Sequence, residues 1–359
     1  LSKILKKLLI NMSLNKIKSA FWKIYSFGSK EYKKNYYGSF SFWRLLMINI
    51  AKPGRLLNRL RYGQLFRNHK KSKDLFQTNY LDNKENNISD IKKEKLLKAL
   101  DDLVKYGGCV IPEYFSSKEI DQLKEINKDK INSLTKDQQD KNINNNDILP
   151  LSPELIKIWL DDSILSLIKA FFGTTVYARN YPCAIYTKVA SNYKDMDSAE
   201  VKRMHWAKDW HVDHSVLFNM HVILEDINKE GARMQILKSS DKFHHYGSNF
   251  SDELIENQNF EKIECFGKKG TVYLHSGNVV HRFKAVPGTD RLLTHFEFSP
   301  GSNILLNTKG IVKSLNNGYD LDKLGNKQME IIYPLFPRQL HKGYDIKNDS
   351  YQPTRFRGI

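Results

Sequence analysis

Short hydrophobic runs, separated by polar or glycine-bearing loops, characterise the chain from residue 174 onward. The runs are rich in β-branched and aromatic residues, which favour strands over helices. They cover residues 174–177, 184–189, 216–224, 233–237, 270–274 and 292–298. A succession of short strands without long helices between them predicts a mainly β domain with an antiparallel sandwich or jelly-roll architecture.

The N-terminal half of the chain has a helical pattern instead. Residues 90–106 predict a helix, and Gly107 ends it because glycine readily adopts the left-handed conformation found at helix C-termini. A short strand is expected to begin at Cys109. Ser116 and Glu119 have the spacing of a capping box, in which each side chain bonds the backbone N–H of the other residue, so a further helix is predicted there.

Changes in composition predict four segments. They are a basic, aromatic-rich helical extension over residues 1–73, a polar linker over 74–95, the β domain over 96–305 and an irregular tail over 306–359. Within the β domain, residues 132–147 are rich in Asn, Asp and Lys and predict a mobile loop. Residues 152–172 predict a helix that Gly173 closes, so helices are expected to flank the strands.

The positive charge of the chain is confined to its first fifth. Residues 1–73 contain 18 Lys or Arg and a single acid, Glu31, whereas the rest of the chain has 39 basic and 39 acidic residues. Residues 1–12 also place leucines and isoleucines on one helical face and lysines on the other. Two interpretations stay open: basic helices that attach to an anionic membrane surface, or helices that dock on the main domain. The balanced remainder makes nucleic acid an unlikely partner.

The cysteines indicate a reducing environment. Cys109, Cys183 and Cys265 are odd in number, far apart in the sequence and form no Cys-x-x-Cys pair. A disulfide framework or a zinc knuckle is therefore not expected, and the predicted location is cytoplasmic, with peripheral membrane attachment as one of the two interpretations of the basic extension. The sequence begins with Leu1 rather than Met, so starts at Leu1 and at Met12 both stay open.

Histidines are concentrated in the β-rich region. Nine of the eleven lie between residues 205 and 295. They are His205, His211, His214, His221, His244, His245, His275, His281 and His295. Imidazole together with carboxylate is the ligand set of non-haem ferrous centres, which use two histidines and one acid. A metal site is the hypothesis that this clustering favours.

The spacing of the candidate ligands narrows the hypothesis. About one His-x-Asp or His-x-Glu pair is expected by chance in this composition, so such a pair alone decides nothing. The pair His211 and Asp213 precedes a predicted strand, and residues i and i+2 of extended backbone point the same way. The second pair, His295 and Glu297, lies within a predicted strand, where both side chains share one face. That face is either exposed to solvent or supports the metal ligands without contacting the metal. The third ligand must come from another strand, and His281 follows the run that begins at residue 270.

The ordered set of motifs resembles the phytanoyl-CoA dioxygenase family of Fe(II)- and 2-oxoglutarate-dependent oxygenases. The matching segments, which together span about residues 96–300, are Ala99–Pro112, Trp210–Asp213, Gly231–Lys242 and Gly270–Arg291. The family's Pro-Gly-Ser-His is replaced here by Leu-Lys-Ser-Ser at residues 237–240, so we expect the substrate loop to differ. The resemblance implies a double-stranded β-helix, the cupin-like jelly roll, over residues 96–305.

The resemblance also implies roles for individual residues. His211, Asp213 and His281 would bind iron, and Arg291 would bind 2-oxoglutarate, while His221 would line the cosubstrate pocket. His275 is not expected to be a ligand. O2 is the second cosubstrate and ascorbate a possible reductant. The implied activity is hydroxylation of a small organic or lipid-like molecule, because relatives that halogenate lack the carboxylate that Asp213 supplies.

Three other classes of protein remain open. A cupin-like metal-binding protein or isomerase would share the barrel and histidines but would not need Arg291. A nucleic-acid demethylase would be expected to have further arginines after residue 291, and residues 292–308 contain none. A membrane-surface scaffold would use residues 1–73 but would leave the histidines unexplained.

Overall fold

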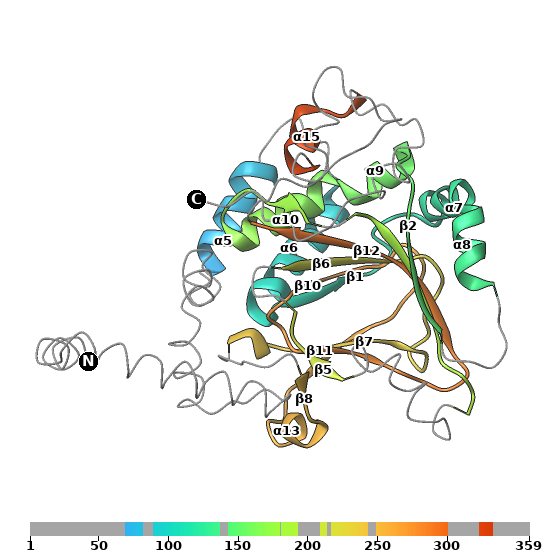
Figure 1. Cartoon of the computed structure of the whole chain (residues 1–359). Coiled ribbons are helices and arrows are strands. Elements are labelled where there is room, and N and C mark those ends of the chain that lie inside the picture. The colour runs from blue at the N-terminus through green and yellow to red at the C-terminus, as the bar shows by residue number, and fades with distance from the viewer. Residues whose placement is uncertain are drawn as a thin grey trace, which may run out of the picture.

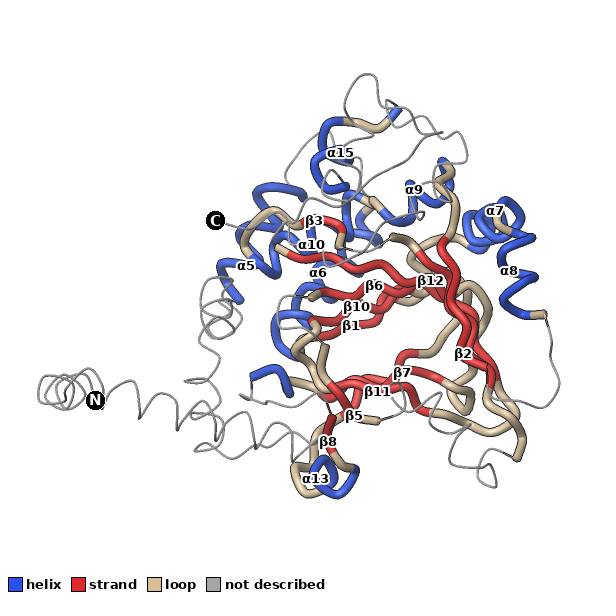
Figure 2. The backbone as a smooth tube through the Cα atoms, in the orientation of Figure 1, coloured by secondary structure: helices blue, strands red, loops and turns tan. Residues whose placement is uncertain are grey.

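Two antiparallel β-sheets face each other in the centre of the molecule (Figure 2). The computed structural model describes residues 69–81, 89–136, 143–179, 181–192, 209–213, 217–242, 249–300 and 323–332. The helices predicted within residues 1–68 lie outside these ranges. Helices cover the outer face of the larger sheet (Figure 1).

The larger sheet has seven strands. Their order is β1 (Gly108–Ile111), β10 (Val272–Ser276), β6 (Phe218–Ile223), β12 (Asp290–Ser299), β4 (Cys183–Lys188) and β2 (Ile143–Ile148), with β3 (Tyr177–Ala178) paired to β12. The order in the smaller sheet is β8 (Asn249–Phe250), β5 (Trp210–His211), β11 (His281–Lys284), β7 (Arg233–Leu237) and β9 (Lys262–Cys265). From β4 to β7 and again from β9 to β12 the chain alternates between the sheets, which is the winding of a double-stranded β-helix. The predicted fold class is therefore confirmed.

Helices from before and after the first strand close the outer face of the larger sheet. They are α5 (His69–Phe76), the π-helical turn η1 (Gln77–Leu81), α6 (Asp90–Tyr106), α7 (Ser117–Ile126), α8 (Lys128–Thr135), α9 (Pro153–Trp159) and α10 (Asp162–Phe172). Short helical segments also occur at η3 (Ser240–Lys242), α13 (Asp252–Glu256) and α15 (Asn326–Ile332). None of the helices in the described ranges has the length and hydrophobicity that a membrane span requires.

Strand β6 shows how the larger sheet separates two environments. Met220 and Val222 belong to the main apolar core, which the helices share. The alternate residues Asn219, His221 and Ile223 therefore face the smaller sheet, because successive side chains of a strand point to opposite faces. All six residues of β6 are buried. Polar side chains on this inner face are thus held in a strand that has no exposed side.

Several local predictions are confirmed. Helix α6 spans the predicted residues, and Gly107 caps it with a φ of 80°. The capping box of Ser116 and Glu119 is present at the start of α7. The helix predicted over 152–172 is instead two helices, α9 and α10, because Asp161 caps a new helix with its side chain.

Other parts differ from expectation. The mobile loop predicted over 132–147 is wrong at both ends, since α8 continues to Thr135 and β2 begins at Ile143 and pairs with β4. The packed part of the chain also begins before residue 96. Phe76 and Tyr80, in the expected linker, are buried against the main core. In the expected C-terminal tail, α15 buries Ile331 and Ile332.

Gly270, in the turn before β10, should be the least replaceable of the described glycines. Its φ is 86°, and an added Cβ would lie 1.9 Å from the carbonyl oxygen of Phe115. We expect Gly270→Ala to lower the free energy of unfolding by more than about 2 kcal/mol, because it combines left-handed backbone strain with a collision against backbone. Gly288→Ala is the control, since Gly288 has a φ of 74° but no atom within 4 Å of the added Cβ. Equal urea midpoints for the two variants would contradict this account.

Candidate metal centre

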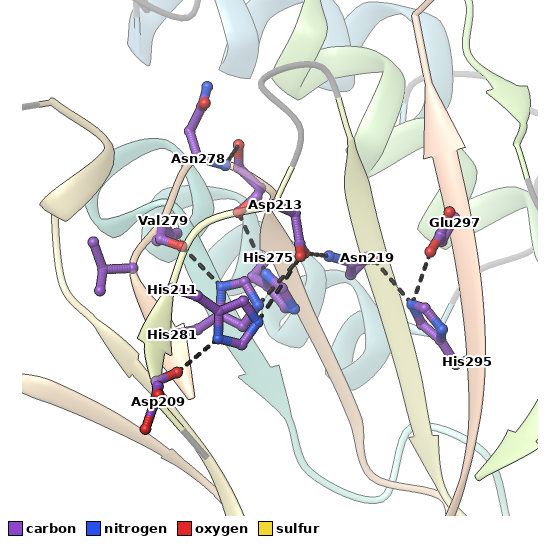
Figure 3. A network of polar contacts seen from close by, with 12 residues as sticks. Asp209, His211, Asp213, Asn219, His275, Asn278, Val279, His281, His295 and Glu297 are labelled. Atoms are coloured by element: carbon purple, nitrogen blue, oxygen red, sulfur yellow. Dashed lines mark hydrogen bonds and ion pairs between the residues drawn. The ribbon is translucent and has the colours of Figure 1, made fainter. Parts of the chain in front are cut away.

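The three predicted ligands converge where β5 ends and β11 begins in the smaller sheet. His211 ends β5, Asp213 follows two residues later and His281 begins β11. One possible ligand atom from each residue lies within 4.8 Å of the others. The Nε2 atoms of His211 and His281 are 4.0 Å and 3.4 Å from Asp213 Oδ1 and Oδ2, respectively (Figure 3). These separations suit a cation held between two imidazoles and one carboxylate.

Backbone carbonyl groups orient both imidazoles. His211 Nδ1 lies 2.7 Å from the carbonyl oxygen of Asp209, and His281 Nδ1 lies 2.9 Å from that of Val279. A carbonyl oxygen only accepts hydrogen bonds, so in each neutral ring Nδ1 carries the proton. The Nε2 lone pair is then free, and both Nε2 atoms face Asp213 (Figure 3). The rings therefore have the tautomer that metal binding needs.

Trp210 fixes the short strand that carries His211. Its indole is buried and donates a hydrogen bond of 2.8 Å from Nε1 to Asp252. The guanidinium carbon of Arg282 lies 4.1 Å from the ring centroid of Trp210, and Arg282 also donates to Asp252. Neighbouring residues of a strand point to opposite faces of the sheet. The Trp210 side chain therefore lies on the face of the smaller sheet opposite to the one from which His211 projects. The tryptophan beside His211 thus has a structural role.

Burial and mutual electrostatics set the charge of the three side chains. Burial, reinforced by the nearby His281, lowers the pKa of His211 to about 4. Burial alone would raise the pKa of Asp213, but the imidazoles of His281, His211 and His275 and a hydrogen bond from Asn219 outweigh it, so this pKa is lowered. At neutral pH His211 is therefore neutral and Asp213 is charged, as metal ligands must be.

Arg291 does not join the three converging residues but lies on the inner face of the larger sheet. It is 8% exposed, and its guanidinium carbon lies 4.1 Å from the centroid of the Phe283 ring. Its Nε is 3.5 Å from Thr187 Oγ1, while Nη1 has no hydrogen-bond partner among the described residues. Burial lowers the pKa of Arg291, although arginine keeps its charge at neutral pH. A buried cation with a free donor is suited to a carboxylate ligand.

His221 lies on the same inner face. Its ring stacks on Tyr273 and on His295, with a centroid separation of 4.5 Å in each case. Both ring nitrogens of His221 and the Tyr273 hydroxyl are buried without a hydrogen-bond partner in the described part of the chain. Burial also lowers the pKa of His221, so its ring is neutral at neutral pH. Polar groups of this kind are available to a bound molecule.

Sequence reasoning missed one residue that contacts the candidate ligand Asp213. Asn219 donates a hydrogen bond of 2.7 Å from Nδ2 to Asp213 Oδ2. The only signal was its position two residues before His221, which puts both side chains on one face of the strand. His275 lies beside the site, with its ring centroid 4.4 Å from that of His281. His205, His214, His244 and His245 lie outside the described residues.

The comparisons with known proteins identify one family. The family model described as phytanoyl-CoA dioxygenase (PhyH) matches residues 103–286, just over half of the chain. No curated protein matches the chain significantly.

Similar solved structures include three proteins of low sequence identity. The α-ketoglutarate-dependent epimerase SnoN from nogalamycin biosynthesis is 13% identical, with a TM-score of 0.41 over 58% of this chain and 84% of that chain. EctD from S. alaskensis, crystallised with 2-oxoglutarate and 5-hydroxyectoine, is 15% identical, with a TM-score of 0.43 over 57% and 76%. HygX from Streptomyces hygroscopicus, with nickel and 2-oxoglutarate bound, is 18% identical, with a TM-score of 0.40 over 56% and 86%.

The lowered pKa of His211 predicts a pH dependence of stability. Histidine in the unfolded chain titrates near 6.5, so between pH 6.5 and about 4 the unfolded state binds a proton that the native state does not. The stability contributed by neutral His211 is complete above pH 6.5 and is lost as the pH falls toward 4. We expect metal-free protein to lose about 2 kcal/mol from this group between about pH 7 and about pH 4.5.

Urea unfolding of EDTA-treated protein at the two pH values measures this loss. His211→Gln should lose less stability than the wild type over the same interval, because glutamine has no proton to gain. An identical loss of stability in both proteins would contradict the assignment of this pH dependence to His211.

Proposed function

Because the chain belongs to the phytanoyl-CoA dioxygenase family, we propose that it is an Fe(II)- and 2-oxoglutarate-dependent dioxygenase that hydroxylates a small organic or lipid-like substrate. In this reaction one atom of O2 enters the new hydroxyl group and the other enters succinate, while CO2 is released from 2-oxoglutarate. The observation that carries the proposal is the convergence of His211, Asp213 and His281.

His211, Asp213 and His281 are proposed to hold the iron. Two neutral imidazoles and one carboxylate leave a divalent ion with net positive charge and with positions open to other ligands. When bound, iron and 2-oxoglutarate together supply the oxidation of a C–H bond by O2. The protein side chains bind, orient and enclose the reactants. The carbonyl groups of Asp209 and Val279 hold the two rings in the required tautomer.

Arg291 is proposed to bind the far carboxylate of 2-oxoglutarate. A guanidinium can donate two parallel hydrogen bonds to a carboxylate, and such bonds are strong in a buried place. Nη1 of Arg291 has no partner among the described residues, which is costly unless a ligand completes it. The Tyr273 hydroxyl could donate to the same ligand, and the flat His221 ring would form a wall of the pocket. This unpaired cation favours an oxygenase over a cupin-like protein that only binds metal.

Succinate formation tests the proposal directly. Full-length protein with Fe(II), 2-oxoglutarate and air should release succinate even without its substrate, and His211→Ala should reduce this release to background. Arg291→Gln should raise the KM for 2-oxoglutarate about 10- to 100-fold, because hydrogen bonds to a charged group are lost.

Two matched variants serve as controls. Asp226→Asn alters an exposed carboxylate that pairs with Lys268, and it should keep wild-type succinate release. Arg233→Gln removes another buried arginine, which lies on β7 and pairs with Glu264 on β9. This variant should leave the KM for 2-oxoglutarate unchanged. Succinate release that is independent of iron, or equal in His211→Ala, would refute the oxygenase function.

The basic extension is proposed to attach the enzyme to an anionic membrane surface. Its 18 Lys or Arg against one acid within residues 1–73 support electrostatic attraction to acidic headgroups. Since α5 begins at His69 and packs on the domain, a truncation should remove residues 1–66 only. We expect the full chain, but not the truncated one, to sediment with vesicles containing phosphatidylserine. Equal sedimentation of both proteins would exclude the attachment, and vesicles of phosphatidylcholine alone are the control.

A further inference from the structure

Asn219 connects the candidate metal centre to the larger sheet. Its Nδ2 donates to Asp213 Oδ2 over 2.7 Å, and its Oδ1 lies 3.0 Å from His295 Nε2 (Figure 3). The side chain is 2% exposed and comes from β6. It thus bridges a carboxylate that follows the smaller sheet and an imidazole of the larger sheet.

The chemistry at both ends of the amide fixes its orientation. The ionised carboxylate of Asp213 only accepts hydrogen bonds, so the NH2 group of Asn219 must face it. The amide oxygen then faces His295, whose Nε2 must carry the proton and donate. The same nitrogen lies 3.8 Å from Glu297 Oε1, a separation beyond hydrogen-bond distance. Rotation of the amide by 180° would place Oδ1 against the Asp213 carboxylate, and two acceptors cannot form a hydrogen bond, which excludes the alternative orientation.

The two partners of this hydrogen bond differ in how firmly the fold holds them. Asn219 is in a fully buried strand, paired with Glu297 on β12 and with His275 on β10. Asp213 follows the two-residue strand β5, and its side chain is 28% exposed. The rigid member therefore positions the less constrained one.

We propose that Asn219 is a positioning residue for the metal ligand Asp213. Its amide donates to Oδ2 and would hold the carboxylate in one orientation when Asp213 binds the metal. Without this donor, nothing on β6 would restrain rotation of the Asp213 carboxylate. His295 supports the arrangement by keeping the amide from rotating. This inference rests on the proposed function of the same site.

Titration of the full-length protein with Co(II), followed by calorimetry and by the visible absorption spectrum, tests the role of Asn219. Asn219→Leu keeps a similar volume and removes both hydrogen bonds. We expect its affinity for Co(II) to fall about 10- to 100-fold, as is usual when a group that orients a ligand is lost. The spectrum at saturating Co(II) should also change, because it reports the arrangement of ligands and not the stability of the fold.

Asn127→Leu is the matched control. Asn127 is likewise 2% exposed and donates from Nδ2, but to the carbonyl of Leu123 between α7 and α8. This variant should have wild-type affinity and spectrum even if it is less stable. A second pair of variants keeps the test valid if Asn219→Leu misfolds. His295→Gln keeps an N–H donor for Asn219, whereas His295→Leu does not. Only His295→Leu should therefore alter the spectrum.

The outcomes separate the two proposals. If the wild type binds Co(II) and His211→Ala does not, while Asn219→Leu retains wild-type affinity and spectrum, the positioning role is wrong and the metal centre stands. If the wild type itself does not bind Co(II), the proposed function fails and this inference fails with it. The inference is supported if the spectrum changes in Asn219→Leu and His295→Leu but not in Asn127→Leu or His295→Gln.

Discussion

The pairing of β5 with β11 is the contact on which the candidate metal centre depends. The register puts His211 directly opposite His281, and their ring centroids lie 4.3 Å apart. Opposed residues of an antiparallel pair project from the same face, so this one register brings two imidazoles together. A strand of two residues has few hydrogen bonds of its own. The buried Trp210, on the opposite face, supplies the packing that keeps β5 in place.

The larger sheet supplies the surroundings of the site. Its inner face carries His221, His275 and Arg291, each buried with at least one nitrogen unpaired among the described residues. Such groups cost stability, about 1–3 kcal/mol for each one left unsatisfied. The outer face of the same strands packs on the helices and offsets this cost by burying apolar surface. The protein thus combines a stable outer layer with an inner face left available for ligands.

The sequence predicted the strands that bury long apolar runs, and it missed those that do not. Strand β2 reads Ile-Asn-Asn-Asn-Asp-Ile and resembles a loop in composition, yet it forms the edge of the larger sheet by backbone pairing with β4. Strands β5 and β11 are short and contain the polar residues of the site. Backbone pairing needs no apolar side chain, so composition gave no signal for these strands.

The sequence by itself determined the family, the mainly β fold and the three residues of the candidate metal centre, His211, Asp213 and His281. The types of these residues and their order along the chain were sufficient for this. Only the tertiary structure revealed the contact of Asn219 with Asp213, the stacking of His221 on His295 and the packing of α5 on the domain. The physical reason is register. When every residue of a strand such as β6 is buried, alternation no longer distinguishes its faces. Which side chain then meets a residue many positions away is decided by how the strands pair.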